Sequence, residues 1–217
     1  MHISSDGADP TERFERLRLL HARVVRDSVA LVHRVTPGDL DRPTPCAGWT
    51  VADLLAHMTA QHRGFAAAAL GDGADLAHWS VRPVTDTVEA VARYAEAAER
   101  VVAAFAALDA PDRPFLLPEF TVDRTFPAGR AVGFHFIDYV VHGWDIARGL
   151  DLPYDPEPDV LDAALPIALS VPDGDTRLAP DSPFRPGIPL PPGAATLDRI
   201  LATLGRTPDG PIGGTAC

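Results

Sequence analysis

The stretch FHFIDYVVHGWD, residues 134–145, holds the densest group of polar side chains in an otherwise strongly apolar part of the sequence. Its titratable residues recur at spacings of three, four and three, and they are His135, Asp138, His142 and Asp145. In an α-helix these spacings place all four side chains on one stripe. Because buried polar groups need partners, we expect this stripe to face other polar groups inside a helical protein.

The same helical periodicity of apolar residues occurs in three other long segments. Together with the quoted stretch, it predicts helices over residues 10–35, 50–70, 85–108 and 128–148. Thr50 is suited to cap the second helix in a capping box with Asp53, and Gly71 or Gly73 to end it. Gly149 is suited to cap the fourth. Four long helices with Pro- and Gly-rich connections predict an all-α fold, an antiparallel four-helix bundle.

The sequence beyond the fourth helix is less regular. A weaker helix is predicted over residues 160–169, with a break at Pro166. Seven prolines between positions 172 and 192 predict a stiff, irregular segment. A short last helix is expected over residues 194–204, closed by Gly205.

Length and composition fit one globular domain. The chain has 217 residues, of which 46% are hydrophobic and 23% charged, which is enough to build a sizeable core. We expect a single domain over residues 1–217, with a core over 10–150 and a C-terminal extension over 151–217. A short extended piece around residues 120–125 is the only strand-like segment we predict.

The charge balance excludes several classes of protein. Nineteen basic residues stand against thirty acidic ones, for a net charge of -11, which argues against binding to a phosphate backbone. All nineteen are arginine, so lysine-based mechanisms are excluded. No apolar run approaches the roughly 18 residues of a membrane span, and the first residues do not resemble a signal peptide. We therefore expect a cytoplasmic protein without nucleic-acid or membrane partners.

A metal site is the chemistry that the polar stripe favours. Asp138 and His142 lie one helical turn apart and can reach one cation. A third ligand must come from another helix, and His57, in LLAHM over residues 54–58, is the best candidate. His135 lies about 10.5 Å from His142 along the helix axis, too far to share the ion. We therefore predict His135 as a catalytic pocket residue.

Other interpretations of these residues stay open. His57 is also compatible with a core histidine bonded to a carbonyl, and Asp138 with His142 is compatible with a buried ion pair. His21 and His62 also lie on predicted core faces and could replace His57. Asp145 could orient His142 or pair with Arg148. Cys46 is expected to pack within its Pro-rich loop rather than to react.

Three segments resemble a known family. They are TPCAGWTVADLLAH at 44–57, VVHGWDIARG at 140–149 and LDRILATLGRTP at 197–208. Together they are similar to the DinB-like metal-binding superfamily, and most to the branch related to mycothiol-dependent maleylpyruvate isomerase. The resemblance implies a four-helix bundle. It also implies a divalent ion held by one histidine of the second helix and by an acidic residue and a histidine of the fourth, here His57, Asp138 and His142.

Two departures from the family pattern are visible. Asp138 stands where the isomerase branch typically has glutamate, which is one methylene longer, so direct and water-bridged ligation both stay open. The family's isomerase also carries a C-terminal domain that helps to form its site, and the residues after 150 leave little room for all of it.

Three functions follow as hypotheses. The first is an isomerase or S-transferase in which a divalent ion, zinc or else nickel or iron, activates mycothiol as co-substrate against a small electrophilic metabolite. The second is a hydrolase or biosynthetic tailoring enzyme that uses metal-bound water. The third is a non-catalytic metal or small-molecule binding bundle, for which His21 or His62 would complete the ligand shell. A homodimer is left open.

Overall fold

The computed structural model describes residues 9–46, 48–179 and 184–210. The predicted bundle helices are α1 (Pro10–Val32), α2 (Val51–Ala69), α3 (Thr87–Ala106) and α4 (Ala128–Gly149). Two helices follow them, α5 (Pro158–Ser170) and α6 (Thr196–Thr203). The short elements are the 3-10 helices η1 (Pro37–Asp39), η2 (Leu76–Trp79) and η3 (Asp175–Leu178) and the antiparallel strands β1 (Pro114–Phe115) and β2 (Phe126–Pro127). The all-α prediction is confirmed.

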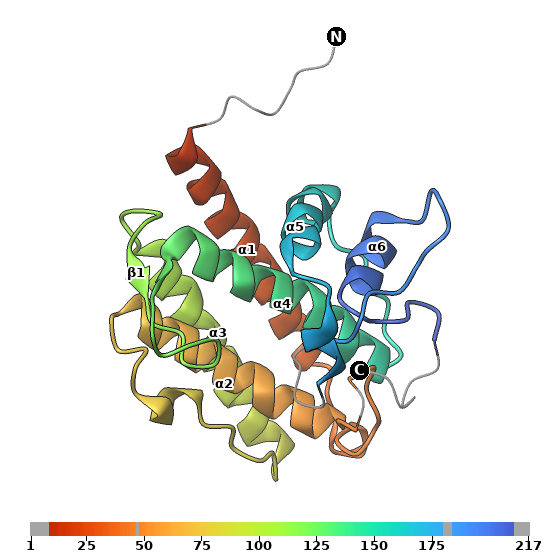
Figure 1. The fold of residues 1–217 in the computed structure, drawn as a ribbon. Helices are drawn as coiled ribbons and strands as arrows, with labels where there is room; N and C mark the ends of the chain where they lie inside the picture. The colour runs from red at the N-terminus through yellow and green to blue at the C-terminus, as the bar shows by residue number, and fades with distance from the viewer. Residues whose placement is uncertain (1–8, 47, 180–183, 211–217) are drawn as a thin grey trace.

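The four long helices pack around one core. α1 lies against α4 and α3, and α2 lies against α3 and α4 (Figure 1). The largest side chains buried between them include Leu54, Tyr94, Phe105, Phe136 and Tyr139. α5 packs on α4, and α6 packs on α5, so the C-terminal extension covers α4 from outside the bundle. No helix among the described residues is long and apolar enough to cross a bilayer.

The ends of α2 confirm the predicted caps. The Thr50 hydroxyl accepts a hydrogen bond from the Asp53 backbone N–H at 3.2 Å, and the Asp53 carboxylate accepts one from the Thr50 N–H at 3.0 Å. At the other end Gly71 adopts a φ of 91°, a left-handed conformation that glycine adopts without strain. The capping box fixes where α2 begins, and thereby the face on which His57 lies.

Two predicted ends of helices are wrong. α1 ends at Val32 because the chain turns into η1, where Pro37 holds Thr36 extended. Gly149 is the last residue of α4 rather than its cap; a Cβ there would lie 3.1 Å from Val51 Cγ2, so its small size lets the start of α2 approach. The left-handed residue of this turn is Asp151, with a φ of 55°.

Two further local predictions need correction. Pro166 lies inside an unbroken α5, because burial of Val160, Ala164 and Ala168 holds this helix in place despite the lost hydrogen bond. Residues 120–125 form no strand, since their apolar side chains Phe120 and Val122 are exposed. The extended pairing lies on either side of them, in β1 and β2.

Candidate metal centre

The structure brings the three predicted ligands together. His57 comes from the second turn of α2, whereas Asp138 and His142 come from successive turns of α4. One ligand atom of each lies within 4.8 Å of the other two. His142 Nε2 is 3.3 Å from an Asp138 oxygen, and the His57 and His142 rings meet edge to face with centroids 5.3 Å apart. Ligation of a metal by this group stays a prediction.

His142 lies between two carboxylates. Its Nδ1 is 2.9 Å from Asp145 Oδ2, and its Nε2 faces Asp138. Burial alone would lower the pKa of His142, but the two carboxylates outweigh it and raise the pKa to about 9. Without a cation the ring therefore carries two protons, and the one on Nε2 occupies the place where a cation would bind.

The other two residues are in the protonation states that metal binding requires. Burial lowers the pKa of His57 to about 4, with further lowering by His142 and Arg206, so the ring is a neutral imidazole. Burial would raise the pKa of Asp138, but His142, His57 and Arg206 hold it below its ordinary value. Two imidazoles and one carboxylate are a common donor set for zinc with an open position. The residues present thus fit a divalent ion.

A buried ion pair supports His142 from behind. Asp145 is completely buried, and its carboxylate accepts hydrogen bonds from His142 Nδ1 and, at 3.0 Å, from Arg206 Nη2. Burial would raise the pKa of Asp145, yet Arg206 and His142 hold it at about 2. Cys46 Sγ packs against both partners, 3.2 Å from the carboxylate and 3.3 Å from the guanidinium. The arrangement fixes the Nδ1–H of His142 and directs Nε2 toward Asp138.

Asp145 therefore orients His142, one of the two roles left open by the sequence. Arg148, the other partner considered, donates to the Gly210 carbonyl and lies over the Trp144 ring instead. Cys46 is buried in its loop, as expected.

Arg206 is a site residue that the sequence did not single out. It follows α6, where Gly205 at a φ of 80° turns the chain back and the Arg206 N–H bonds the Leu201 carbonyl. This turn directs the guanidinium toward Asp145, 61 residues away in sequence. Its only signal was its position in the third family-like segment, LDRILATLGRTP.

Glu119 is a second residue that the sequence did not indicate. It lies in the loop between β1 and β2, and Gln61 of α2 donates to both of its oxygens at 2.8 and 2.9 Å. Burial raises the pKa of Glu119, and the nearby Asp138 carboxylate adds to the rise. The pKa of Glu119 thus lies above its ordinary value, although the hydrogen bonds from Gln61 act in the opposite direction.

His135 does not join this centre but forms a histidine cluster with His21 and His62. All three rings are completely buried. His135 Nδ1 is 2.9 Å from His21 Nε2, and its Nε2 is 3.3 Å from His62 Nδ1. Burial lowers the pKa of His21 to about 3 and those of the other two well below the ordinary value. The cluster is therefore a row of neutral imidazoles, and His21 and His62 pair with His135 rather than with the ligands.

Two other groups of potential ligands occur among the described residues. One joins Cys46, His142 and Asp145, but the Asp145 carboxylate already accepts bonds from His142 and Arg206. The other lies at the start of η2, where Asp75 caps the Ala77 N–H and His78 of η2 pairs with Asp72. Hydrogen bonding within the protein accounts for both groups.

Trp49 forms one wall beside the candidate ligands. Its ring centroid is 4.9 Å from that of His57, and about a third of the side chain, 36%, is exposed. Asp138 is also reached by solvent, with 29% of its side chain exposed, in contrast to Asp145. The candidate ligands are therefore not all sealed from solvent.

Comparison with known proteins identifies a family for this chain. The family model described as mycothiol maleylpyruvate isomerase N-terminal domain matches residues 21–147, which include all three candidate ligands. Two uncharacterized proteins of Mycobacterium tuberculosis, Rv0738 of strain H37Rv and MT0763 of strain CDC 1551, are each 27% identical over 192 residues, covering 87% of this chain and 97% of theirs.

One solved structure that resembles this chain is the crystal structure of the mycothiol-dependent maleylpyruvate isomerase. Its TM-score is 0.61 at 16% sequence identity, with 91% of each chain covered. The shared fold therefore extends beyond the four helices into the C-terminal extension. This corrects the expectation that the residues after 150 leave little room for the C-terminal part of such a chain.

Proposed function

Because the chain belongs to the mycothiol maleylpyruvate isomerase N-terminal domain family, we propose that it is a metal-dependent enzyme that uses a thiol to act on a small electrophilic metabolite. The thiol is mycothiol, and the reaction is an isomerisation or an S-transfer. The observation that carries the proposal is the convergence of His57, Asp138 and His142, with the far nitrogen of His142 bound by Asp145. An oriented histidine of this kind is typical of metal ligands.

In this proposal the three residues hold one divalent ion. When bound, the ion supplies Lewis acidity that lowers the pKa of a coordinated thiol, so that thiolate forms near neutral pH. Zinc suits the donors best, although nickel and iron share the preference for imidazole and carboxylate. Asp138 acts as a direct ligand or through a bridging water.

The surrounding residues then have separate tasks. Asp145 and Arg206 hold His142 in one orientation, and Trp49 covers His57. Glu119, with its raised pKa, is placed to hold or deliver a proton beside Asp138. His135 remains the sequence-based candidate for proton transfer. Because its two ring nitrogens face His21 and His62, it does not reach a substrate at the metal centre directly.

A panel of thiols tests the reaction. Metal-loaded protein is incubated with maleylpyruvate or generic electrophiles in the presence of mycothiol, of glutathione or of no thiol, with His142→Ala and the exposed-site variant His33→Ala alongside. We expect turnover with mycothiol, loss in His142→Ala and no change in His33→Ala. Equal turnover without any thiol would instead favour a hydrolase or tailoring enzyme that uses metal-bound water. Metal binding without turnover in any arm would favour a binding protein.

The cellular context of the proposed enzyme rests on the sequence. We still predict a cytoplasmic protein of a single domain, without nucleic-acid or membrane partners. A homodimer also stays a prediction.

A further inference from the structure

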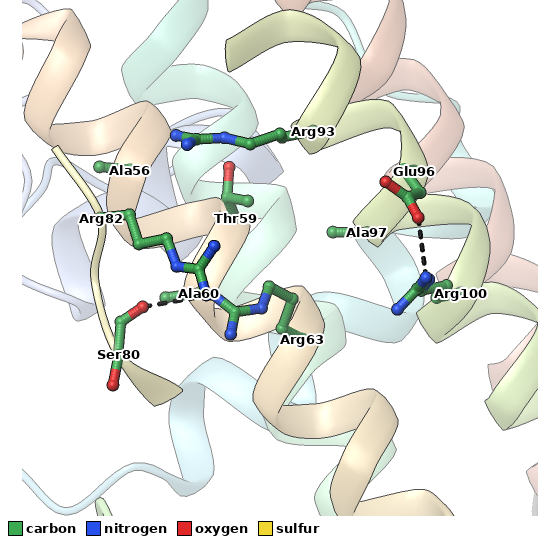
Figure 2. A pocket seen from close by; sticks show the side chains of 10 residues that line it. All are labelled: Ala56, Thr59, Ala60, Arg63, Ser80, Arg82, Arg93, Glu96, Ala97 and Arg100. Atoms are coloured by element: carbon green, nitrogen blue, oxygen red, sulfur yellow. Dashed lines mark hydrogen bonds and ion pairs between the residues drawn. The ribbon is translucent and has the colours of Figure 1, made fainter. Parts of the chain in front are cut away.

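A pocket lies between α2, α3 and the segment that joins η2 to α3. It has a volume of about 230 Å³ and contains none of the candidate metal ligands. Figure 2 shows its lining, which consists of Ala56, Thr59, Ala60, Arg63, Ser80, Arg82, Arg93, Glu96, Ala97 and Arg100. Four of these ten residues are arginines and only one is acidic, in a chain whose net charge is -11. The pocket is thus a local concentration of positive charge.

The four guanidinium groups are close enough to repel one another. Burial lowers the pKa of Arg63, and Arg82, Arg93 and Arg100 each lower it further. Figure 2 shows the guanidinium groups of Arg63 and Arg82 next to each other above Ala60. Like charges gathered in a recess create a positive potential that attracts anions.

Two of the four arginines of the pocket have no carboxylate partner among the described residues. Arg93 and Arg100 each have one carboxylate partner, Glu89 at 3.1 Å and Glu96 at 2.8 Å. Arg63 donates only to neutral groups, the backbone carbonyls of Ala77 at 3.0 Å and Ser80 at 3.4 Å. These two bonds hold its side chain in place but do not neutralise it.

Arg82 is the least satisfied of the four. It makes no hydrogen bond or ion pair with any residue that the structure describes. Its neighbour in the pocket, Arg63, is itself cationic. A ligand with several negative oxygens could accept hydrogen bonds from both guanidinium groups at once.

The rest of the lining narrows the chemistry of the ligand. The floor is formed by the small apolar side chains Ala56, Ala60 and Ala97. The Thr59 and Ser80 hydroxyl protons are already donated, to the carbonyls of Leu55 and Leu76. The donors offered to a ligand are therefore guanidinium N–H groups, whose planar fork matches the oxygens of a phosphate.

We propose that this pocket binds a small phosphate-bearing anion, through Arg63 and Arg82 as primary contacts and with Arg93 and Arg100 at its edge. The volume admits a phosphate or pyrophosphate group with a small attached moiety. The net negative charge of the whole chain favours a free metabolite over the backbone of a nucleic acid. This site is independent of the proposed thiol chemistry, because it shares no residue with the metal centre.

Isothermal titration calorimetry with inorganic phosphate and with pyrophosphate tests the site in the full-length protein. The variants are Arg82→Gln and, as a control that removes the same charge from an exposed position of α1, Arg26→Gln. We expect saturable binding of pyrophosphate to the wild type, a loss of about tenfold in affinity in Arg82→Gln, as for one charge-assisted contact, and less than a twofold change in Arg26→Gln. Inorganic phosphate should bind to the same site more weakly.

His142→Ala separates this proposal from the metal centre, since pyrophosphate can also bind metal ions. Binding that persists in His142→Ala supports the pocket. Binding that is lost in His142→Ala but unchanged in Arg82→Gln would place the anion at the metal centre and overturn the proposal. Equal losses in Arg82→Gln and Arg26→Gln, tighter binding of citrate than of pyrophosphate, or no binding to the wild type would overturn it as well.

Discussion

Two histidines on the same helix behave in opposite ways. His135 and His142 lie two turns apart on α4, yet the pKa of His135 is well below its ordinary value, whereas that of His142 is raised to about 9. Burial favours the neutral ring in both cases. The difference comes from their neighbours: His135 touches two other imidazoles, whereas His142 lies between two carboxylates. Neighbouring charge, rather than depth, therefore makes one of them suited to exchange a proton for a metal ion.

The largest expected effect comes from removing the carboxylate that supports His142. Asp145→Ala leaves Arg206 buried beside His142 without a negative partner, and we expect a loss of about 3–5 kcal/mol in the free energy of unfolding. Urea denaturation measures it. The double variant Asp145→Ala/Arg206→Met should lose much less than the sum of the two single variants. Additive losses, or a loss below about 1 kcal/mol for Asp145→Ala, would show that the ion pair does not stabilise this region.

The matching change in the histidine cluster should be smaller. His135→Leu keeps an apolar side chain of similar size in the core but leaves ring nitrogens of His21 and His62 without partners. We expect a loss of about 1–3 kcal/mol. Because the cluster lies apart from the candidate ligands, the metal content should equal that of the wild type. Loss of metal in a folded His135→Leu protein would contradict the separation of the two regions.

The dependence of stability on acid pH tests whether the histidine cluster is neutral in the folded protein. The pKa of His21 is about 3 in the folded state, against 6.5 as its ordinary value, so below 6.5 the unfolded chain binds more protons. Stability should therefore fall as the pH drops from about 6.5 toward 3 and show no contribution from His21 above that window. His21→Gln should fall less steeply than the wild type in equilibrium denaturation at successive pH values. If the stability of the wild type and of His21→Gln fell equally as the pH drops below 6.5, the burial of a neutral His21 would be contradicted.

The smallest expected effect is the number of protons that zinc binding releases from the metal centre. Because the pKa of His142 is about 9 without metal, its ring is protonated at neutral pH, and a cation at Nε2 must displace that proton. Zinc binding should release about one proton at neutral pH, and its apparent affinity should rise with pH up to about 9. Calorimetry in buffers of different ionisation enthalpy gives the number. Asp138→Asn removes one of the two carboxylates beside His142 and should lower the number of protons released. An unchanged number in this variant would argue against the raised pKa of His142.

Local signals in the sequence accounted for the bundle and for the meeting of the candidate ligands. Thr50 and Asp53 define the start of α2, and the four-residue spacing of Asp138 and His142 places them on one face of α4. Both are short-range features, set by helix geometry alone. His57 required one further assumption, that the two helices face each other.

What the sequence did not predict depends on long-range packing. Arg206 reaches Asp145 only because α6 and the turn at Gly205 return the chain to α4, and no spacing encodes such a contact. The pairing of His135 with His21 and His62 depends on the rotation of three helices about their axes, which periodicity fixes only approximately. Pro166 was misjudged for a related reason, since packing of α5 outweighs the local cost of a proline.

Metal content measured by elemental analysis tests the central claim most directly. Wild-type protein, His57→Ala, Asp138→Ala, His142→Ala and the exposed-site control His33→Ala are purified in the same way and loaded with zinc. The account predicts about one ion per chain in the wild type and in His33→Ala, and a loss of at least about tenfold in zinc affinity in His57→Ala and His142→Ala. If Asp138→Ala is the only one of the three ligand variants that retains zinc, Asp138 contacts the ion through a bridging water. Stoichiometric metal retained in a folded His142→Ala protein would contradict the site.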